Sequence, residues 1–326
     1  MSVLFRTFWI VIQALLAGAP GPQTPSPPTP AGIILQSADG GRSWKDLRVE
    51  LSGKEQPISI CVAGGELWLG TNKGLYRGSA VLPAPEWEKE FFPEEAVTGI
   101  FPGKSGPYVL SEWSGFFQKL PFANLWLPLH NHLKDNIVNA VFESPDGALF
   151  VGCRSGIFKS ADAGNTWLQV YDACRVSNLT EANGVLIGGG SRGIVRSTDG
   201  GEHWQEVLSA GSAAFHVRYT GQGFMAIFEG REGAGFEKKR ELYVSADNGA
   251  SWRRLTESLP PALRSIYTLE QAGAYLFACS DAGIFSSADG GQTWEQVRPA
   301  MPGGAGNFYR LIASDRAIFV LPIQGC

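Results

Sequence analysis

The sequence contains one polar segment whose carboxylates could carry out chemistry on a sugar. Glu229 and Glu232 lie together in residues 229–239, a run rich in charged residues and glycine. Glycoside hydrolysis requires two carboxylates on either side of the scissile bond, so this pair is a candidate acid and base. The alternative is that the segment is a solvated charge run on the surface.

Three arginines could bind an acidic ligand. Arg175, Arg218 and Arg310 follow or lie in apolar, strand-like stretches, and Tyr309 precedes the last of them. A guanidinium binds a carboxylate through two parallel hydrogen bonds, so three arginines pointing to one place would form an anion site. The alternative is that they satisfy backbone carbonyls or water inside the fold.

No metal or cofactor site is expected from the remaining chemistry. His130 and His132 are one residue apart but have no third ligand, and the five cysteines show no CxxC spacing. The sequence has no GxSxG motif, phosphate-binding loop or dinucleotide fingerprint. We therefore expect no metal, no cofactor and no confidently assigned catalytic residue.

An eight-residue element, Ser-x-Asp-x-Gly-x-x-Trp, occurs five times and indicates what positions these groups. The Asp carboxylate can accept backbone N–H bonds within a tight turn, and the Gly supplies a positive φ. The Trp then follows at the start of a strand and buries a large ring between layers. We expect the five aspartates to be structural rather than catalytic: Asp39, Asp162, Asp199, Asp247 and Asp289.

The tryptophans of these boxes belong to a longer period. Two degraded copies, ending at Trp87 and Trp126, fill the gap between the first and second boxes. The seven tryptophans then fall at positions 44, 87, 126, 167, 204, 252 and 294, so the intervals range from 37 to 48 residues. A period near 42 residues with four short strands per unit predicts an all-β, seven-bladed β-propeller of antiparallel blades.

The fourth unit shows the four predicted strands: an inner strand at 137–142, a second at 149–152, a third at 156–159 and an outer one at 167–170. The first box has no inner strands before it, whereas two apolar runs, 308–312 and 317–321, follow the last. We predict that these C-terminal runs are the inner strands of the blade whose outer strands begin the ring. The alternative count is six blades.

The loops that would gather on one face of this propeller carry a separate set of exposed residues. We expect a binding face from the loops between second and third strands and from those between blades. The first loop set supplies Lys73, Glu112, Trp113, Arg154, Arg192, Glu229, Arg231, Glu232 and Asp281, and the second supplies His130, His132, Lys134, Asp135, Asp172 and Arg175.

The boxes resemble the Asp-box (BNR) repeats of sialidases, sortilin-type receptor propellers, xyloglucan-active glycosidases and the photosystem II stability/assembly factor family. The resemblance covers roughly residues 32–326 and is strongest to the photosystem II factor family. It implies that each box lies at the turn between third and outer strands, opposite the usual binding face. It implies a propeller but does not by itself specify an activity.

A sialidase-like activity would imply an arginine cluster, a Tyr–Glu nucleophile pair and an Asp acid. The early Phe/Tyr-Arg-Ile-Pro segment of sialidases is absent, and the nearest fragment, residues 309–312, lacks its proline. A sialidase-like or other glycoside hydrolase therefore remains the alternative. The leading hypothesis is a non-enzymatic scaffold that binds a protein or glycan through its loop face.

The N-terminal residues resemble a secretory leader. Arg6 precedes a short apolar run, and small residues at 17–19 suggest a cleavage site. We predict a signal peptide at 1–19, a proline-rich linker at 20–31 and the propeller at 32–326. The protein is then secreted or periplasmic; the alternative is an uncleaved N-terminal membrane anchor.

Composition limits the partners. Lys plus Arg number 27 and Asp plus Glu 31, so the net charge is −4. Nucleic acid is not an expected partner, because there is no cationic excess to neutralise phosphates. We expect a monomer that does not span a membrane once the leader is removed.

Overall fold

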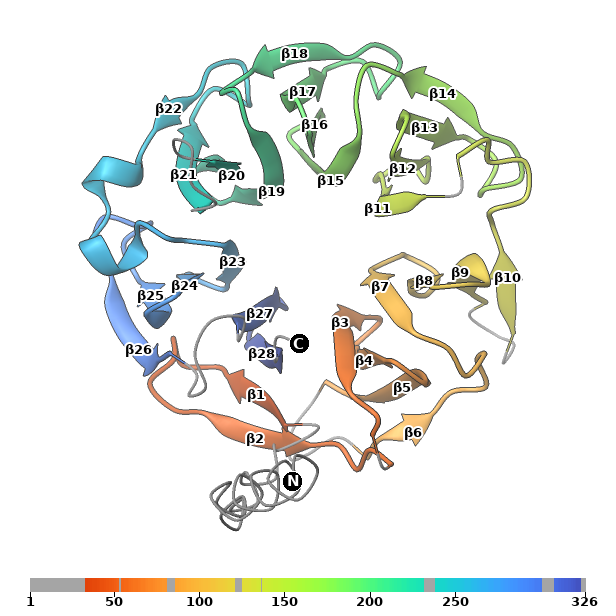
Figure 1. The fold of residues 1–326 in the computed structure, drawn as a ribbon, viewed down its shortest axis with the longest axis horizontal. Coiled ribbons are helices and arrows are strands. Elements are labelled where there is room, and N and C mark those ends of the chain that lie inside the picture. Colours follow the sequence, from red (N-terminus) through yellow and green to blue (C-terminus); the bar gives the residue numbers. More distant parts are fainter. Residues whose placement is uncertain are drawn as a thin grey trace, which may run out of the picture. The chain divides into compact units, whose positions relative to one another are not determined.

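The computed structural model describes residues 33–52, 54–80, 86–120, 125–135, 137–231, 238–300 and 308–323. These residues belong to one compact unit, residues 32–326. Its strands form seven four-stranded antiparallel sheets arranged as blades of a ring (Figure 1). The predicted leader and linker lie outside the described residues. In the described part of the chain, no helix is long and apolar enough to cross a membrane.

Each blade presents its strands in the order inner, second, third and outer. Blades 2 to 4 consist of β3 (Pro57–Ala63), β4 (Glu66–Thr71), β5 (Gly74–Ser79) and β6 (Glu88–Lys89); β7 (Val97–Phe101), β8 (Tyr108–Ser111), β9 (Gly115–Lys119) and β10 (Trp126–Pro128); and β11 (Val138–Glu143), β12 (Leu149–Cys153), β13 (Gly156–Ser160) and β14 (Leu168–Tyr171).

Blades 5 to 7 continue the ring in the same order. They consist of β15 (Val176–Ala182), β16 (Val185–Gly190), β17 (Gly193–Ser197) and β18 (Gln205–Leu208); β19 (Ala213–Thr220), β20 (Gly223–Arg231), β21 (Lys238–Ser245) and β22 (Arg253–Arg254); and β23 (Thr268–Ala272), β24 (Tyr275–Ser280), β25 (Gly283–Ser287) and β26 (Glu295–Pro299). Two short 3₁₀ helices, η1 (Thr256–Ser258) and η2 (Pro261–Leu263), join blades 6 and 7.

Blade 1 closes the ring with strands from both ends of the unit. Its inner strands are β27 (Phe308–Ala313) and β28 (Ile318–Ile323), and its outer strands are β1 (Ile33–Ser37) and β2 (Lys45–Arg48). Strand β28 pairs with β1 in the register Leu35↔Val320. The predicted closure and the count of seven blades are confirmed, and the six-blade alternative is wrong.

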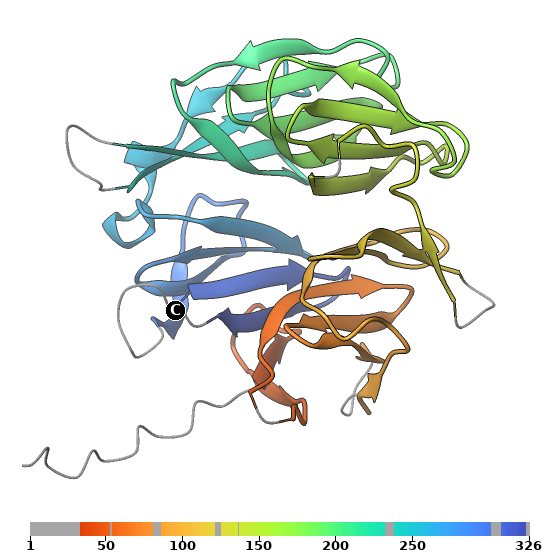
Figure 2. The same ribbon diagram turned by 45° about the vertical axis from the view of Figure 1, so that its right-hand side comes forward.

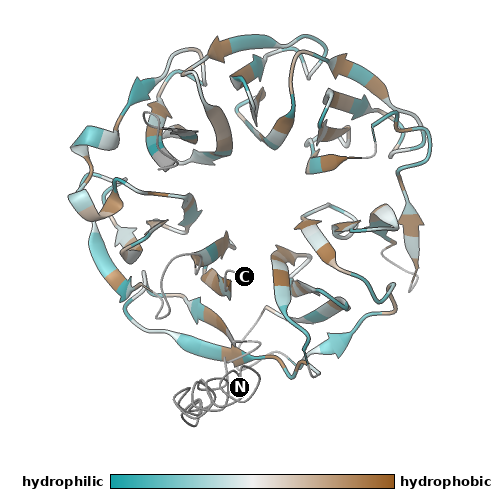
Figure 3. Cartoon of the chain, in the orientation of Figure 1, coloured by the Kyte–Doolittle hydropathy of each residue, from teal (hydrophilic) through white to brown (hydrophobic). Residues whose placement is uncertain are grey.

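Seven hydrophobic clusters lie between neighbouring blades, and each has one of the seven periodic tryptophans packed against it. Trp204 of blade 5, for example, packs against the cluster that blades 4 and 5 share. The rings are only partly buried, because each lies near the rim, where the outer strands are mostly hydrophilic (Figure 3). These contacts explain why the period of the indoles equals the period of the blades.

Strand ends in blade 4 differ from the predicted ones by one residue. Strand β11 begins after Ile137, and β14 begins after Trp167. Trp167 ends the turn of its box, and its indole Nε1 donates to the carbonyl of Leu129 in the preceding blade, 3.0 Å away. Trp167 therefore packs against the neighbouring blade, and the hydrogen bonds of the outer strand begin at the next residue.

Candidate functional site

The strand directions divide the turns between two faces. Loops joining second to third strands, and loops joining one blade to the next, gather on one face, which we call the loop face. Turns joining inner to second strands, and the Asp-box turns joining third to outer strands, gather on the opposite face, which we call the box face (Figure 2).

Each Asp-box carboxylate is used within its own turn. In blade 6, Asp247 Oδ1 accepts from Ser245 Oγ (2.8 Å) and from the backbone N–H of Ser251 (2.9 Å), and its Oδ2 accepts from Ser251 Oγ (2.6 Å). The N–H of Gly249 donates to Ser245 Oγ at 2.8 Å. The other four boxes repeat these bonds at Asp39, Asp162, Asp199 and Asp289.

These bonds stabilise the ionised aspartates. Side-chain and backbone donors lower the pKa of Asp39 and Asp247 to about 2, and they also lower the pKa of the other three. In blade 5 the usual hydroxyl is replaced by His203, whose Nδ1 lies 2.8 Å from Asp199 Oδ2. With both oxygens occupied, these carboxylates have little free capacity for a ligand.

The three candidate arginines contact different groups. Arg218 on β19 donates from Nε to Glu270 Oε1 (2.9 Å) and from Nη1 to Asn178 Oδ1 (3.3 Å). Arg310 on β27 donates to the carbonyl of Ile58 at 2.9 Å. Arg175 is exposed in the loop between blades 4 and 5. Among the described residues, the three arginines share no partner.

Two of these contacts join inner strands of neighbouring blades. Arg218 connects blade 6 to Glu270 of blade 7, and burial raises the pKa of that carboxyl despite the opposing effect of the guanidinium. Arg310 connects blade 1 to blade 2, and burial lowers its pKa. Tyr309 is nearly buried, and its hydroxyl donates to the carbonyl of Pro299 at 3.2 Å. These groups serve contacts within the fold.

The candidate carboxylate Glu229 forms an ion pair on the loop face. Its Oε2 accepts from Arg240 Nε at 3.3 Å, and Asp281 Oδ1 lies 3.9 Å from Nη1 of the same arginine. The guanidinium also lies over the ring of Tyr267, 5.4 Å from its centroid. Glu232, the proposed second carboxylate, lies outside the described residues.

The predicted binding residues occupy the turns between second and third strands. Those with described side chains are all exposed: Lys73, Trp113, Arg154, Arg192 and Asp281. Arg231 ends β20, and its side chain is not described. Trp113 is the most notable, because 81% of its surface is exposed although indole is a costly group to leave in water.

The loop that carries Trp113 is held by the preceding loop. The N–H of Glu112 donates to the carbonyl of Ala96 at 2.9 Å, and Ser111 Oγ donates to the Glu95 carboxylate. Burial acts to raise the pKa of Glu95, but hydrogen bonds from Ser111 and Ser114 outweigh it and lower the pKa. The exposed indole is therefore presented on an ordered support.

Sequence reasoning missed a second aromatic on these loops. Phe91 lies in the same loop as Glu95 and is 82% exposed. The signal was the Phe-Phe-Pro stretch at 91–93, of which one ring, Phe92, is buried and the other is not.

Sequence reasoning also missed a carboxylate repeat on the loop face. Glu55, Glu95 and Asp135 each precede an inner strand, at intervals of 40 residues. Each accepts from its own blade, either from the last residue of the second strand or from the turn that follows it. Glu55 accepts from Thr71 Oγ1 at 2.6 Å, and Asp135 from the N–H of Ser155 at 2.7 Å. The sequence signal of this repeat was the 40-residue spacing of the three acidic residues.

The histidine pair forms no metal site among the described residues, where no group of three or more His, Cys, Asp or Glu side chains converges. His130 Nδ1 lies 3.3 Å from the carbonyl of Phe116, and its ring packs on Phe117. Its neighbour His132 has a φ of 68°.

Residues 168–315 match the model of a family described as photosynthesis system II assembly factor YCF48. The resemblance predicted from the boxes is confirmed over this range. The chain is therefore a seven-bladed propeller of the BNR-repeat type that is similar to this assembly-factor family. Among curated proteins, none matches the chain.

Solved structures share the fold at low identity. The extracellular domain of a hybrid two component system from B. thetaiotaomicron is 13% identical, with a TM-score of 0.56 over 81% of this chain and 39% of that one. An ancestral GH74 enzyme is 14% identical, with a TM-score of 0.56 over 84% and 41%. This chain thus spans about two fifths of each protein. A chain of the mitotic checkpoint complex is 13% identical, with a TM-score of 0.56 over 74% and 76%.

Proposed function

We propose that this protein is an exported, non-catalytic scaffold that binds a protein partner through the loop face of blades 2 and 3. The single observation that carries the proposal is the exposure of two large aromatic side chains, Phe91 and Trp113, on loops that hydrogen-bond to each other. Aromatic side chains of this kind often dominate the energetics of protein interfaces, because they bury a large area at a small loss of side-chain entropy.

Three further observations support a non-catalytic scaffold over an enzyme. Arg218 and Arg310 are engaged by Glu270 and by a backbone carbonyl, and Glu229 is neutralised by Arg240. The family matched by residues 168–315 is described as a photosynthesis system II assembly factor. The leader-like N-terminus supports a secreted or periplasmic location.

The test is quantitative recovery of partners from the native host. The tagged protein is compared with Trp113→Ala and Phe91→Ala, and bound proteins are quantified by mass spectrometry after crosslinking. Loss of a central aromatic costs about 2 kcal/mol or more, so we expect the partner to be recovered at least about tenfold less.

The matched control is Leu168→Ala. Leu168 is 64% exposed but lies on the outer strand β14, on the rim of blade 4. We expect this variant to retain the partner. Equal recovery by Trp113→Ala and the parent protein would refute the proposal.

A glycoside hydrolase is the second candidate, favoured by the placement of Glu229 and Asp281 beside Arg240 on the loop face. Turnover of sialosides or β-glucans that is lost in Glu229→Gln would establish it and would overturn the scaffold proposal.

A further inference from the structure

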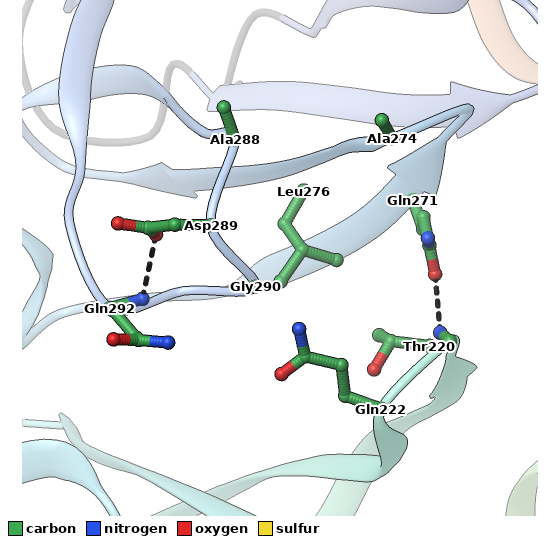
Figure 4. Close-up of a pocket in the computed structure, with 10 residues that line it drawn as sticks. Thr220, Gln222, Gln271, Ala274, Leu276, Ala288, Asp289, Gly290 and Gln292 are labelled. Carbon is green, nitrogen blue, oxygen red and sulfur yellow. Dashed lines mark hydrogen bonds between the residues drawn. The ribbon is translucent and has the colours of Figure 1, made fainter.

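A cavity of about 330 Å³ lies on the box face, between blades 6 and 7. This volume is near the lower end of the range for small-ligand sites, about 300–1,000 Å³. Figure 4 shows the side chains of Gln222 and Gln292 across from each other, with Leu276 above Gln222. The walls are the turn between β19 and β20, the turn between β23 and β24, and the Asp-box turn of blade 7.

The same place between earlier blades is occupied by a basic side chain of the chain itself. Lys159, the residue before the box serine of blade 4, donates from Nζ to the carbonyl of Gly200 in the box of blade 5, 2.8 Å away. Arg196, the equivalent residue of blade 5, donates from Nε to the carbonyl of Asn248 in the box of blade 6, also at 2.8 Å. Blades 4 and 5 thus each use a cation to hold the fourth position of the next box, whereas the equivalent residues of blades 3 and 7, Gln118 and Ser286, are uncharged.

Blade 6 also has no cation at this position. The residue before its box serine is Val244, an apolar side chain that packs against the cluster shared by blades 6 and 7. It cannot donate to Gly290, which is the fourth residue of the box in blade 7 and lines the cavity. Among the described residues, no donor reaches the carbonyl of Gly290.

The remaining polar groups of the cavity are suited to a cation. Lys159 also pairs with Glu202, the sixth residue of its partner box, and Gln292 holds that position in blade 7. The side-chain amides of Gln292 and Gln222 have no hydrogen-bond partner among the described residues, so their oxygens are available as acceptors. Hydrogen bonds, first from Thr293, hold the pKa of Asp289 below its ordinary value and keep it negatively charged at the cavity wall.

We propose that this cavity binds the side chain of a lysine or arginine from a partner protein, whose cationic group takes the position that Lys159 and Arg196 occupy between earlier blades. The carbonyl of Gly290 and the amide oxygens of Gln222 and Gln292 accept its N–H groups, and Leu276 contacts its aliphatic stem. The site lies on the face opposite Trp113, so it stands independently of the function proposed above.

The test uses small probes and the full chain. Nα-acetyl-lysine amide and Nα-acetyl-arginine amide carry the cation, and Nα,Nε-diacetyl-lysine amide is the matched neutral control. The readout is the ¹⁵N spectrum of the side-chain amides, with Gln222 and Gln292 assigned from their alanine variants. We expect saturable shifts of both amides with the two cationic probes and none with the neutral one.

Two variants probe the mechanism. Val244→Lys should place an internal cation on Gly290 and reduce probe binding at least tenfold, whereas the control Val244→Ile should bind as the parent does. Gln292→Glu gives the box of blade 7 the acid that Glu202 supplies in blade 5, and it should tighten probe binding at least threefold. This variant tests the proposal even if Val244→Lys fails to fold. Absence of saturable shifts, equal shifts with the neutral probe, or unchanged binding by a folded Val244→Lys protein would overturn the proposal.

Discussion

At the scale of the residue, the Asp boxes show how one short side chain can organise a turn. The carboxylate of Asp247 accepts three hydrogen bonds from two residues of its own turn, so donors that would otherwise lie near the rim without a partner are satisfied. The lowered pKa is the thermodynamic counterpart of these bonds, because donors that favour the charged form must stabilise the fold when that form is present.

The first prediction concerns acid stability. The pKa of Asp247 is about 2 in the fold and about 3.9 in an unfolded chain, so its contribution is present above about pH 4 and is lost as the pH falls towards 2. We expect Asp247→Asn to lower the Tm at pH 7, with a difference from the parent that shrinks as the pH falls from 4 to 2. Thermal unfolding followed by circular dichroism measures this. Asp46→Asn, an exposed position outside every box, is the control, and an equal effect at both positions would contradict the prediction.

At the scale of the element, blades 2 and 3 lack the box and are joined by other means. Glu90, whose side chain is 3% exposed, accepts from Arg77 Nε of blade 2 at 2.8 Å and pairs with Lys119 of blade 3. The ammonium of Lys119 also lies 5.2 Å from the ring centroid of Trp126. A buried ionic contact between two blades accompanies the degraded repeats.

The second prediction is that Glu90→Gln destabilises the protein by roughly 3 kcal/mol, because it removes the charge of a buried carboxylate that pairs with both Arg77 and Lys119. Glu88→Gln is the matched control: it also pairs with Arg77, but its side chain is 67% exposed, so we expect a change of about 0.5 kcal/mol or less. Urea unfolding at neutral pH compares the two. Similar losses would show that the burial of Glu90 is not what matters.

At the scale of the whole molecule, closure by β28 makes the blades interdependent. This strand lies between β27 and β1, and it joins the last part of the unit to the first. Without it, blade 1 would lose its second strand, and β1 and β2 would be left as an isolated pair with an exposed edge.

The third prediction is that ending the chain after Ser314, which removes β28, abolishes a single cooperative unfolding transition and makes the propeller sensitive to proteolysis. Removal of residues 1–31 is the control, because the compact unit spans residues 32–326. We expect that deletion to leave the unfolding transition unchanged. A truncated protein that still unfolds cooperatively at the Tm of the parent would show that closure contributes little.

The parts of the molecule that could be predicted are those that depend on interactions between residues close in sequence or on a repeated motif. Ser-x-Asp-x-Gly-x-x-Trp specifies a turn through bonds between residues four apart, and Trp126 kept the period even where the box had decayed. Less of the candidate site could be predicted from the sequence. Whether Glu229 stands free or is paired depends on Arg240, which a hairpin brings back to it.

The sequence alone therefore determined the ring, its seven blades, its closure and the turn chemistry, because each rests on contacts within a few residues or on a period repeated along the chain. Only the tertiary structure decided which arginines are engaged, which aromatic of the 91–93 stretch faces water, and that Val244 leaves a cavity beside Gly290. Those outcomes depend on which side chain of one blade reaches the next, and that distance is set by the packing of whole blades.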